Sequence, residues 1–324
     1  MTRGVLFLLL APAFMAEVLT QNMALTTFLQ PVPFVLCALT YGVPVLVIRE
    51  IAAARGLGVN GVVVLGLAYG IFNEGVIAKT LSQPSGPEVF DFSGYGQIGA
   101  MQIGLAIFIV FWHALHSVLY PILIGRWLFP EVADSRWLAS GRARHLRPLF
   151  AVILIALYSL YFVNPVRNDP GTFLVYVAVS AGLVTLAVTV PFFRARPEPP
   201  RAGRVSRWPA LLGATTIVFY VLQIQAPRHV PFAVYLVASV AVIAAAGVAM
   251  GRAGWRPVPQ ILQFGLGDAL TFALFATLMG VKWKGDPAQS IGTGALFAVL
   301  FLLLLHAVRR APQGRAPRAV ASRV

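Results

Sequence analysis

The sequence predicts an all-α membrane protein: a polytopic bundle of about ten transmembrane helices with both termini in the cytoplasm. Hydrophobic residues make up 58% of the 324 residues and charged residues only 11%, and the mean hydropathy is +0.80. This composition excludes an ordinary soluble domain. Apolar runs long enough to cross about 30 Å of hydrocarbon recur along the chain, and Lys and Arg concentrate in alternate loops.

Each predicted helix is an apolar segment bounded by charged residues, prolines or glycines. The first stays apolar through Phe28, with Glu17 its only charge. The fifth to eighth carry no charged residue in their interiors, the ninth contains Asp268, and the second and seventh are the shortest. The predicted spans are residues 4–27, 34–49, 61–82, 98–124, 148–166, 171–193, 209–225, 231–250, 260–281 and 291–308.

Arginine and lysine indicate the orientation, because positive charge in short loops stays on the cytoplasmic side. With the N-terminus inside, all but five of the 25 Lys and Arg fall in the cytoplasm. The net charge of +14 is dispersed over many loops, which predicts contact with anionic lipid headgroups and no nucleic-acid binding. Compact outer loops and cytoplasmic arginines fit a multi-pass protein of the plasma (inner) membrane.

The N-terminus has a second interpretation. Arg3, an apolar run and Ala11-Pro12-Ala13 also resemble a signal peptide, whose removal would leave Glu17 near a free N-terminus on the outside. We favour the uncleaved anchor, because the apolar character continues beyond Ala13 and ten spans fit the charge pattern. Cys37 is the one cysteine, which excludes an intrachain disulfide and a Cys-based zinc site.

We expect a single transmembrane domain over residues 1–308. Its front half, residues 1–147, carries the polar residues, and residues 148–308 form a mainly apolar scaffold. Residues 309–324 form a basic tail that we expect to be disordered and cytoplasmic. The loop Ser82 to Gln97 is rich in Gly, Pro and aromatic residues and is predicted to cover the outer end of the site.

Four ionisable side chains, Glu17, Glu74, His113 and His116, lie deep inside three of the apolar runs. A bilayer core disfavours such groups unless they pair, ligate or react. The two histidines are three residues apart, so both imidazoles are expected on one helix face, where they can act on one ligand or substrate. Counting 1.5 Å per residue places Glu17, Glu74 and His113 at a similar depth, which predicts that they converge.

Several polar side chains accompany these four. Some continue the histidine stripe, some lie beside Glu74, and one is an aspartate in the ninth span that is costly unless it has a partner. The supporting residues are Asn73, Tyr69, Lys79, Ser117, Tyr120 and Asp268.

Three chemistries remain open for this group, beside a packing role in which the side chains hydrogen-bond between helices. In a catalytic site, Glu74 is a general base on water and a histidine polarises a carbonyl or moves the proton. In a metal site, His113, His116, Glu74 and Glu17 supply nitrogen and oxygen ligands for a divalent ion such as zinc, iron or manganese. In a transporter, the same groups exchange protons along a pathway.

The segments EGVIAK, residues 74–79, and WHALH, residues 112–116, resemble the glutamic intramembrane proteases of the CAAX-processing and bacteriocin-immunity type. Their motifs are EExxxR and FxxxH on neighbouring helices, and here Gly75 and Lys79 replace the second glutamate and the arginine. The resemblance implies Glu74 as the water-activating base. It implies His116, with Trp112 at the aromatic position, as the stabiliser of the transition state.

These observations together predict a membrane-embedded enzyme, a hydrolase that uses an intramembrane Glu/His site on a peptide or lipid-linked substrate. A proton- or cation-coupled secondary transporter or flippase is the main alternative, and a metal-binding membrane protein is a further one. The sequence contains no nucleotide-binding motif.

Overall fold

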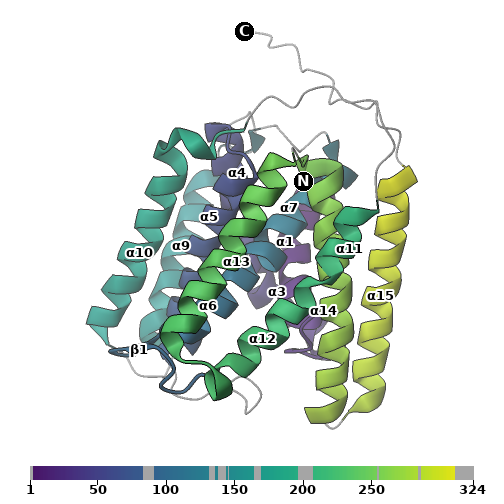
Figure 1. The fold of residues 1–324 in the computed structure, drawn as a ribbon. Coiled ribbons are helices and arrows are strands. Elements are labelled where there is room, and N and C mark those ends of the chain that lie inside the picture. Colours follow the sequence, from purple (N-terminus) through teal and green to yellow (C-terminus); the bar gives the residue numbers. More distant parts are fainter. Residues whose placement is uncertain are drawn as a thin grey trace.

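A computed structural model describes residues 3–82, 91–130, 136–137, 144, 146–163, 169–195, 207–253, 255–283 and 286–310. In these ranges the chain forms a bundle of helices that run side by side, with one two-stranded hairpin, β1 (Gln97–Ile98) and β2 (Met101–Gln102), at one end (Figure 1). The predicted all-α class is confirmed.

The helices differ in regularity along the chain, because several include a segment with π-helical hydrogen bonding: η1, η2, η3, η6 and η10. The short segments η4 and η9 are 3-10 helices. The first half contains α1 (Arg3–Ala13), η1 (Phe14–Val18), α2 (Leu25–Phe28), α3 (Pro31–Cys37), η2 (Ala38–Gly42), α4 (Val43–Arg55), α5 (Val59–Ile71), η3 (Phe72–Ile77), η4 (Thr80–Ser82), α6 (Ile103–Trp112), η6 (His113–Leu119) and α7 (Tyr120–Leu128). The second half contains α9 (Arg147–Val163), α10 (Pro170–Thr189), η9 (Pro191–Phe193), α11 (Trp208–Ala214), α12 (Thr216–His229), α13 (Phe232–Arg252), η10 (Pro257–Ile261), α14 (Leu262–Trp283) and α15 (Pro287–Arg310).

Eight continuous helical stretches in the described residues are long and apolar enough to cross a membrane. They match eight of the ten predicted spans. The fifth predicted span is the shorter apolar helix Arg147–Val163, and the first is the continuous α1 and η1, Arg3–Val18. The second predicted span, residues 34–49, is shorter than the helix at that place, which runs from Pro31 to Arg55.

The prediction of a single helix over residues 4–27 is wrong at its C-terminal end. The helix stops at Val18, and Gln21 has a backbone φ of 57°, in the left-handed region. Polar side chains hold the chain after this end: the Asn22 amide donates to Glu17 Oε2 at 2.7 Å, and the Gln21 amide donates to the Ser290 carbonyl at 3.1 Å. Glu17 therefore lies in the last turn of its helix.

Helix α5 approaches α6 and η6 closely because two glycines face them. A Cβ on Gly66 would lie 2.8 Å from the Ala114 Cα, and a Cβ on Gly70 would lie 2.8 Å from the Val110 carbonyl oxygen. Small residues allow such backbone contact between membrane helices. This contact brings η3, which continues α5, beside η6.

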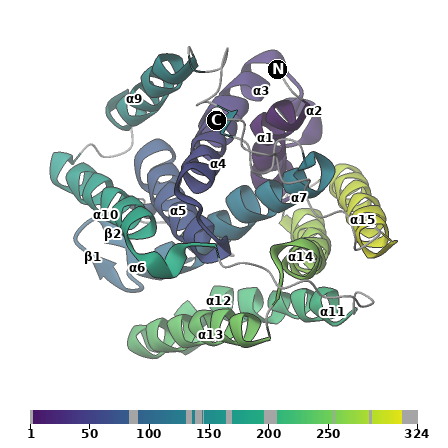
Figure 2. The ribbon, with the colours of Figure 1, turned by 90° about the horizontal axis from the view of Figure 1, so that it is seen from above.

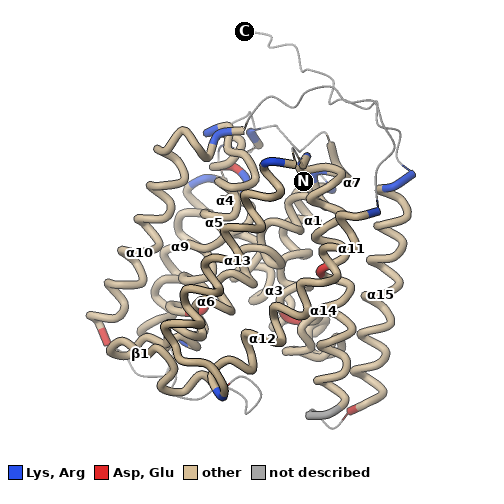
Figure 3. Tube along the Cα trace, viewed as in Figure 1, with Lys and Arg blue, Asp and Glu red and all other residues tan. Residues whose placement is uncertain are grey.

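The other helices surround this contact. Seen from above, α9, α10, α13 and α15 lie on the periphery, with α1, α4, α5 and α7 between them (Figure 2). The peripheral helices expose large apolar side chains such as Leu174, Val237 and Leu303, as expected of surfaces that face lipid. Most of the described Lys and Arg lie at the end of the bundle that holds the N-terminus (Figure 3).

Some predicted features lie outside the described residues: the tail beyond Arg310, most of the loop between Arg194 and Trp208, and residues 83–90 of the predicted cover. The described part of that cover packs on α6, where Phe92 stacks on Phe108, and on α13, where the Tyr95 ring contacts Phe232. The Tyr95 hydroxyl donates to the carbonyl of Val230, just before α13, at 2.8 Å. The helix that follows begins at Ile103 instead of residue 98, because residues 97–102 form the hairpin.

Candidate functional site

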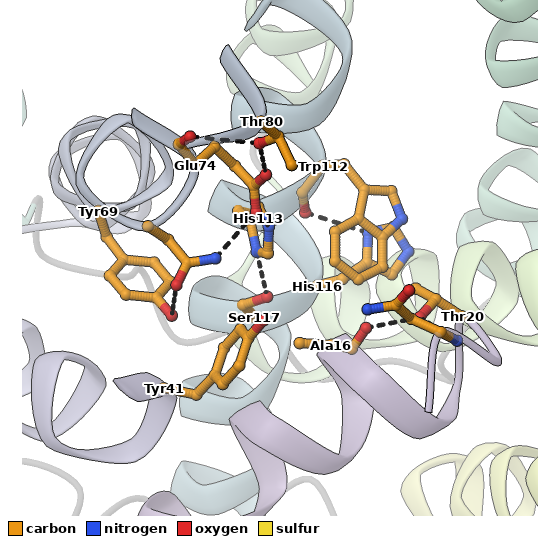
Figure 4. A network of polar contacts seen from close by, with 12 residues as sticks. Ala16, Thr20, Tyr41, Tyr69, Glu74, Thr80, Trp112, His113, His116 and Ser117 are labelled. Atoms are coloured by element: carbon orange, nitrogen blue, oxygen red, sulfur yellow. Dashed lines mark hydrogen bonds and ion pairs between the residues drawn. The ribbon is translucent and has the colours of Figure 1, made fainter. Parts of the chain in front are cut away.

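A buried chain of three side chains joins η3 to η6. Glu74 Oε1 lies 2.7 Å from His113 Nε2, and His113 Nδ1 lies 2.8 Å from Ser117 Oγ (Figure 4). His113 and Ser117 are four residues apart on one segment, so one turn of backbone fixes their separation. All three side chains are buried, and Ser117 has no exposed surface. The result is a continuous carboxylate, imidazole and hydroxyl chain.

Glu74 also receives hydrogen bonds from its own helix end. The Asn73 amide donates to Oε1 at 2.9 Å, and the Thr80 hydroxyl donates to Oε2. Tyr69 contacts Asn73 across one helical turn, with 3.5 Å between the Tyr69 hydroxyl and Asn73 Oδ1. A carboxylate that accepts several hydrogen bonds is stabilised in its charged form. We therefore treat Glu74 as an anion whose oxygens are already occupied.

Glu17 lies beside this chain and does not join it directly. The Tyr41 hydroxyl, from η2, donates to Glu17 Oε1. The Tyr41 ring centroid is 6.1 Å from the His113 ring, and the Tyr69 ring is at the same distance on an edge-to-face geometry. Tyr41 and Tyr69 thus flank His113, and Tyr41 separates it from Glu17.

A second cluster lies on the same segment η6 but involves α12 and α14. Asp268 Oδ2 accepts from the Tyr120 hydroxyl at 2.5 Å and the Tyr220 hydroxyl at 3.4 Å. Thr216 Oγ1 is hydrogen-bonded to Asp268 Oδ1. His116 Nε2 lies 3.5 Å from Asp268 Oδ2, and both side chains are completely buried.

Trp112 closes the second cluster on one side. Its ring is parallel to His116, with 4.6 Å between centroids and 4° between planes. The Trp112 indole nitrogen and His116 Nε2 have no hydrogen-bond partner among the described residues. Of these two buried polar atoms, His116 Nε2 lies next to the Asp268 carboxyl group.

Four of the five π-helical segments in the described residues carry side chains that line or adjoin these clusters. Glu17 lies on η1, Tyr41 on η2, Glu74 on η3, and His113, His116 and Ser117 on η6. Turns of this kind are rare and occur frequently at functional sites. An extra residue in the turn rotates the following side chains, so spacing along the sequence does not fix which neighbour each one meets.

The two imidazoles have different partners in this conformation, so the expectation that both act on one ligand stays a prediction. His113 pairs with Glu74 and His116 faces Asp268. The predicted metal set of His113, His116, Glu74 and Glu17 is accordingly not assembled, and the described residues hold no group of three such donors suited to a metal ion.

The resemblance to the intramembrane proteases implies that His116 works with Glu74. The structure pairs Glu74 with a different histidine. The imidazole next to Glu74 belongs to His113. The Trp112 and His116 pair does form, as a stacked pair that faces Asp268 instead.

Lys79, one of the supporting residues, is fully buried. Its Nζ lies 4.2 Å from the centroid of the Tyr161 ring, and its backbone φ is 57°. The lysine precedes Thr80, the donor to Glu74, so its turn positions that donor.

Four contributors escaped the sequence reasoning: Tyr41, Thr80, Thr216 and Tyr220. Thr216 and Tyr220 are four residues apart in an apolar span, so their two hydroxyl groups share one helix face. This pattern indicates a polar partner on a neighbouring helix. Tyr41 is the polar side chain of a short span and could have been weighed similarly. Thr80 gave no signal, because it reaches Glu74 only through the turn that follows η3.

Comparison with known proteins gives one match. A family model described as an uncharacterized membrane protein family matches residues 5–323. No curated protein and no solved structure matches the chain.

Proposed function

Because the chain belongs to an uncharacterised membrane protein family whose description assigns no activity, we propose its function from the chain of Glu74, His113 and Ser117. The proposal is a membrane-embedded hydrolase that cleaves an ester or amide bond of a peptide or lipid-linked substrate. The observation that carries it is the pair of contacts at 2.7 and 2.8 Å on the two nitrogens of His113.

The protonation pattern of this chain is that of an activated nucleophile. Glu74, already an acceptor, favours a hydrogen on His113 Nε2, which leaves the lone pair of Nδ1 for the Ser117 hydroxyl. A carboxylate, imidazole and hydroxyl in this order form the acid–base chain of serine hydrolases, here with the two ring nitrogens exchanged. Proteins on unrelated folds use the same chain, so it supports a chemistry without implying a family.

The reaction follows from these positions. Ser117 Oγ attacks the substrate carbonyl, and its proton passes to His113 Nδ1. The protonated imidazole, stabilised by Glu74, then donates that proton to the leaving group as the carbonyl carbon loses it. A water molecule repeats the sequence on the acyl group and restores the Ser117 hydroxyl. Glu74 orients His113 in this scheme, in place of the water-activating role that the sequence predicted for it.

Burial of the site constrains how a substrate arrives. Ser117 is completely covered and Tyr41 and Tyr69 flank His113, so helices must separate before an acyl group reaches Oγ. A substrate embedded in the membrane can enter sideways through such an opening. Most described Lys and Arg lie at one end of the bundle (Figure 3), and we propose from the positive-inside rule that this end faces the cytoplasm. A plasma membrane is part of the same proposal.

A serine-reactive fluorophosphonate tests the proposal without knowledge of the substrate. The detergent-purified full chain is incubated with the probe, and the modified residue is located by mass spectrometry. We expect an adduct on Ser117 that is lost in Ser117→Ala and His113→Ala. Ser180→Ala is the matched control, because Ser180 is also buried and donates only to the Ala68 carbonyl, at 3.3 Å.

Absence of an adduct on the folded protein, or an adduct on Ser117 that persists in His113→Ala, would contradict the hydrolase. A proton-coupled transporter is the second candidate, and the specific observation in its favour is the separate pair of His116 and Asp268 inside the same bundle. Proton flux in proteoliposomes that disappears in Asp268→Asn would support it.

A further inference from the structure

Asp268 has surroundings that the proposed hydrolase does not use. Its carboxyl group is completely buried on α14 and is surrounded by hydroxyl groups of α7 and α12, with the His116 imidazole of η6 next to them. No Lys or Arg among the described residues forms an ion pair with it. An isolated carboxylate in such a place is costly unless it gains a proton or a partner charge.

The hydrogen bonds of Thr216 favour a proton on Asp268. Thr216 Oγ1 lies 2.6 Å from the Gly213 carbonyl oxygen and is also hydrogen-bonded to Asp268 Oδ1. An ionised Asp268 and the Gly213 carbonyl both only accept, so they compete for the one hydrogen of the Thr216 hydroxyl. A proton on Asp268 Oδ1 removes this competition, because the carboxyl group can then donate to Thr216 Oγ1. Burial without a partner charge favours the same neutral state.

The same reasoning assigns the tautomer of His116. Its Nδ1 lies 3.3 Å from the Trp112 carbonyl oxygen, which requires a hydrogen on Nδ1. Its Nε2 has no hydrogen-bond partner and lies 3.5 Å from Asp268 Oδ2. A neutral His116 thus presents an unused lone pair to a protonated carboxyl group.

We propose that His116 and Asp268 form a proton-binding site that holds one exchangeable proton. In one state the proton is on Asp268 and His116 is neutral. In the other it has moved to His116 Nε2, and an imidazolium faces a carboxylate that Tyr120 and Tyr220 stabilise by donation. No bond other than the O–H and N–H bonds changes, and the site stays electrically neutral overall.

The neighbouring elements leave this pair as the local proton carriers. The titratable groups that face Asp268 are His116 on η6, Tyr120 on α7 and Tyr220 on α12. Helix α11 and η10, which also pack on α14, contain no ionisable residue, and those of α15 are confined to its C-terminal turns, from His306 onward. His113, three residues before His116, is paired with Glu74.

The proton site lies at the junction of two helical segments. Helices α11 and α12 meet at Thr215, directly before Thr216. When Asp268 is ionised, the hydrogen of Thr216 has two acceptors, the carboxylate and the Gly213 carbonyl. Gly213 is pressed against the Phe264 carbonyl of α14, 2.0 Å from where its Cβ would be, so α11 lies very close to α14 beside this site.

Infrared spectroscopy of the full chain in lipid vesicles tests the site. We expect a carbonyl stretch of a protonated carboxyl group at neutral pH that shifts in D2O, because the proton exchanges. This band should disappear in Asp268→Asn and persist in Asp286→Asn, a matched change of an exposed aspartate. In Thr216→Val the band should remain and move in frequency, because the carboxyl group loses one hydrogen-bond partner.

Three results would overturn the proposal: no protonated-carboxyl band that depends on Asp268, a band that D2O leaves unmoved, or a band unaltered by Thr216→Val. Nitrogen NMR of labelled histidine supplies the second measurement. His116 Nε2 should have the shift of a nitrogen without hydrogen at neutral pH, identified by its loss in His116→Gln. A hydrogen on Nε2 at neutral pH would contradict the assigned state. Neither readout depends on hydrolase activity.

Discussion

The pair of Glu74 and His113 and the pair of Asp268 and His116 each join a carboxyl group to an imidazole of η6. They differ in the hydrogen-bond donors that surround the carboxyl group. Glu74 receives an amide, a hydroxyl and an imidazole, and the chain ends in a serine. Among the described residues Asp268 receives no amide or imidazole hydrogen, and Thr216 Oγ1 also lies 2.6 Å from the Gly213 carbonyl oxygen, so a proton on Asp268 itself is favoured. The difference teaches that the donors and acceptors around a buried pair decide whether it carries charge or stores a proton.

The largest expected effect is on the labelling rate of Ser117, which should depend on the Glu74 cluster and not on the Asp268 cluster. Glu74→Gln should lower the rate of fluorophosphonate labelling at Ser117 by about 10²- to 10⁴-fold, because a neutral amide neither fixes the His113 tautomer nor stabilises its protonated form. Asp268→Asn should leave that rate unchanged. Time-resolved mass spectrometry of the adduct measures both, and equal losses in the two variants would mean that the clusters act as one.

The second largest expected effect is a difference between the two clusters in the free energy of unfolding. Removal of Glu74 in Glu74→Ala leaves His113, Asn73 and Thr80 without their acceptor and should cost about 3–5 kcal/mol, as for one partner of a buried charged pair. Asp268→Ala should cost less, about 1–3 kcal/mol, because the group removed is neutral. Denaturation in mixed micelles gives both values. A larger cost for Asp268→Ala would indicate that Asp268 is the charged partner.

Thr80 and Thr216 allow the charge of the two carboxyl groups to be compared through one hydrogen bond each. Thr80 donates to a carboxylate, so Thr80→Val should cost about 1.5–3 kcal/mol, the range for a hydrogen bond to a charged group. Thr216 meets a neutral carboxyl group, so Thr216→Val should cost about 1 kcal/mol. The free energies of unfolding of the two near-isosteric variants, measured under identical conditions, should differ in that order, and the reverse order would exchange the assigned charges.

The smallest effect lies within the second cluster. The Tyr120 hydroxyl is 2.5 Å from Asp268 Oδ2 and the Tyr220 hydroxyl is 3.4 Å away. Tyr120→Phe should therefore cost about 1 kcal/mol and Tyr220→Phe less than about 0.5 kcal/mol, since the longer contact is weak. Both come from the same denaturation measurement. Equal costs would show that Tyr220 moves closer to Asp268 than the present arrangement has it.

The sequence predicted the depth of the polar side chains in the bundle better than it predicted which side chains contact each other. Depth counting placed Glu74 and His113 together, and they are in contact. It grouped His116 with them, because a spacing of three residues puts two side chains on one face of an α-helix. Residues 113–119 instead form a π-helical turn, in which that spacing rule does not hold. The first span was drawn too long because apolar residues continue after the turn at Gln21.

Composition and apolar run length by themselves determined the class of this protein, because a bilayer core admits only segments that satisfy their own backbone. They also determined which side chains are costly in that core, since the cost depends on the residue type and its depth. The tertiary structure decided that Glu74 has His113 and that Asp268 has His116. These pairings join residues on different helices, and the glycine contacts and π-helical turns that select them act through three-dimensional packing.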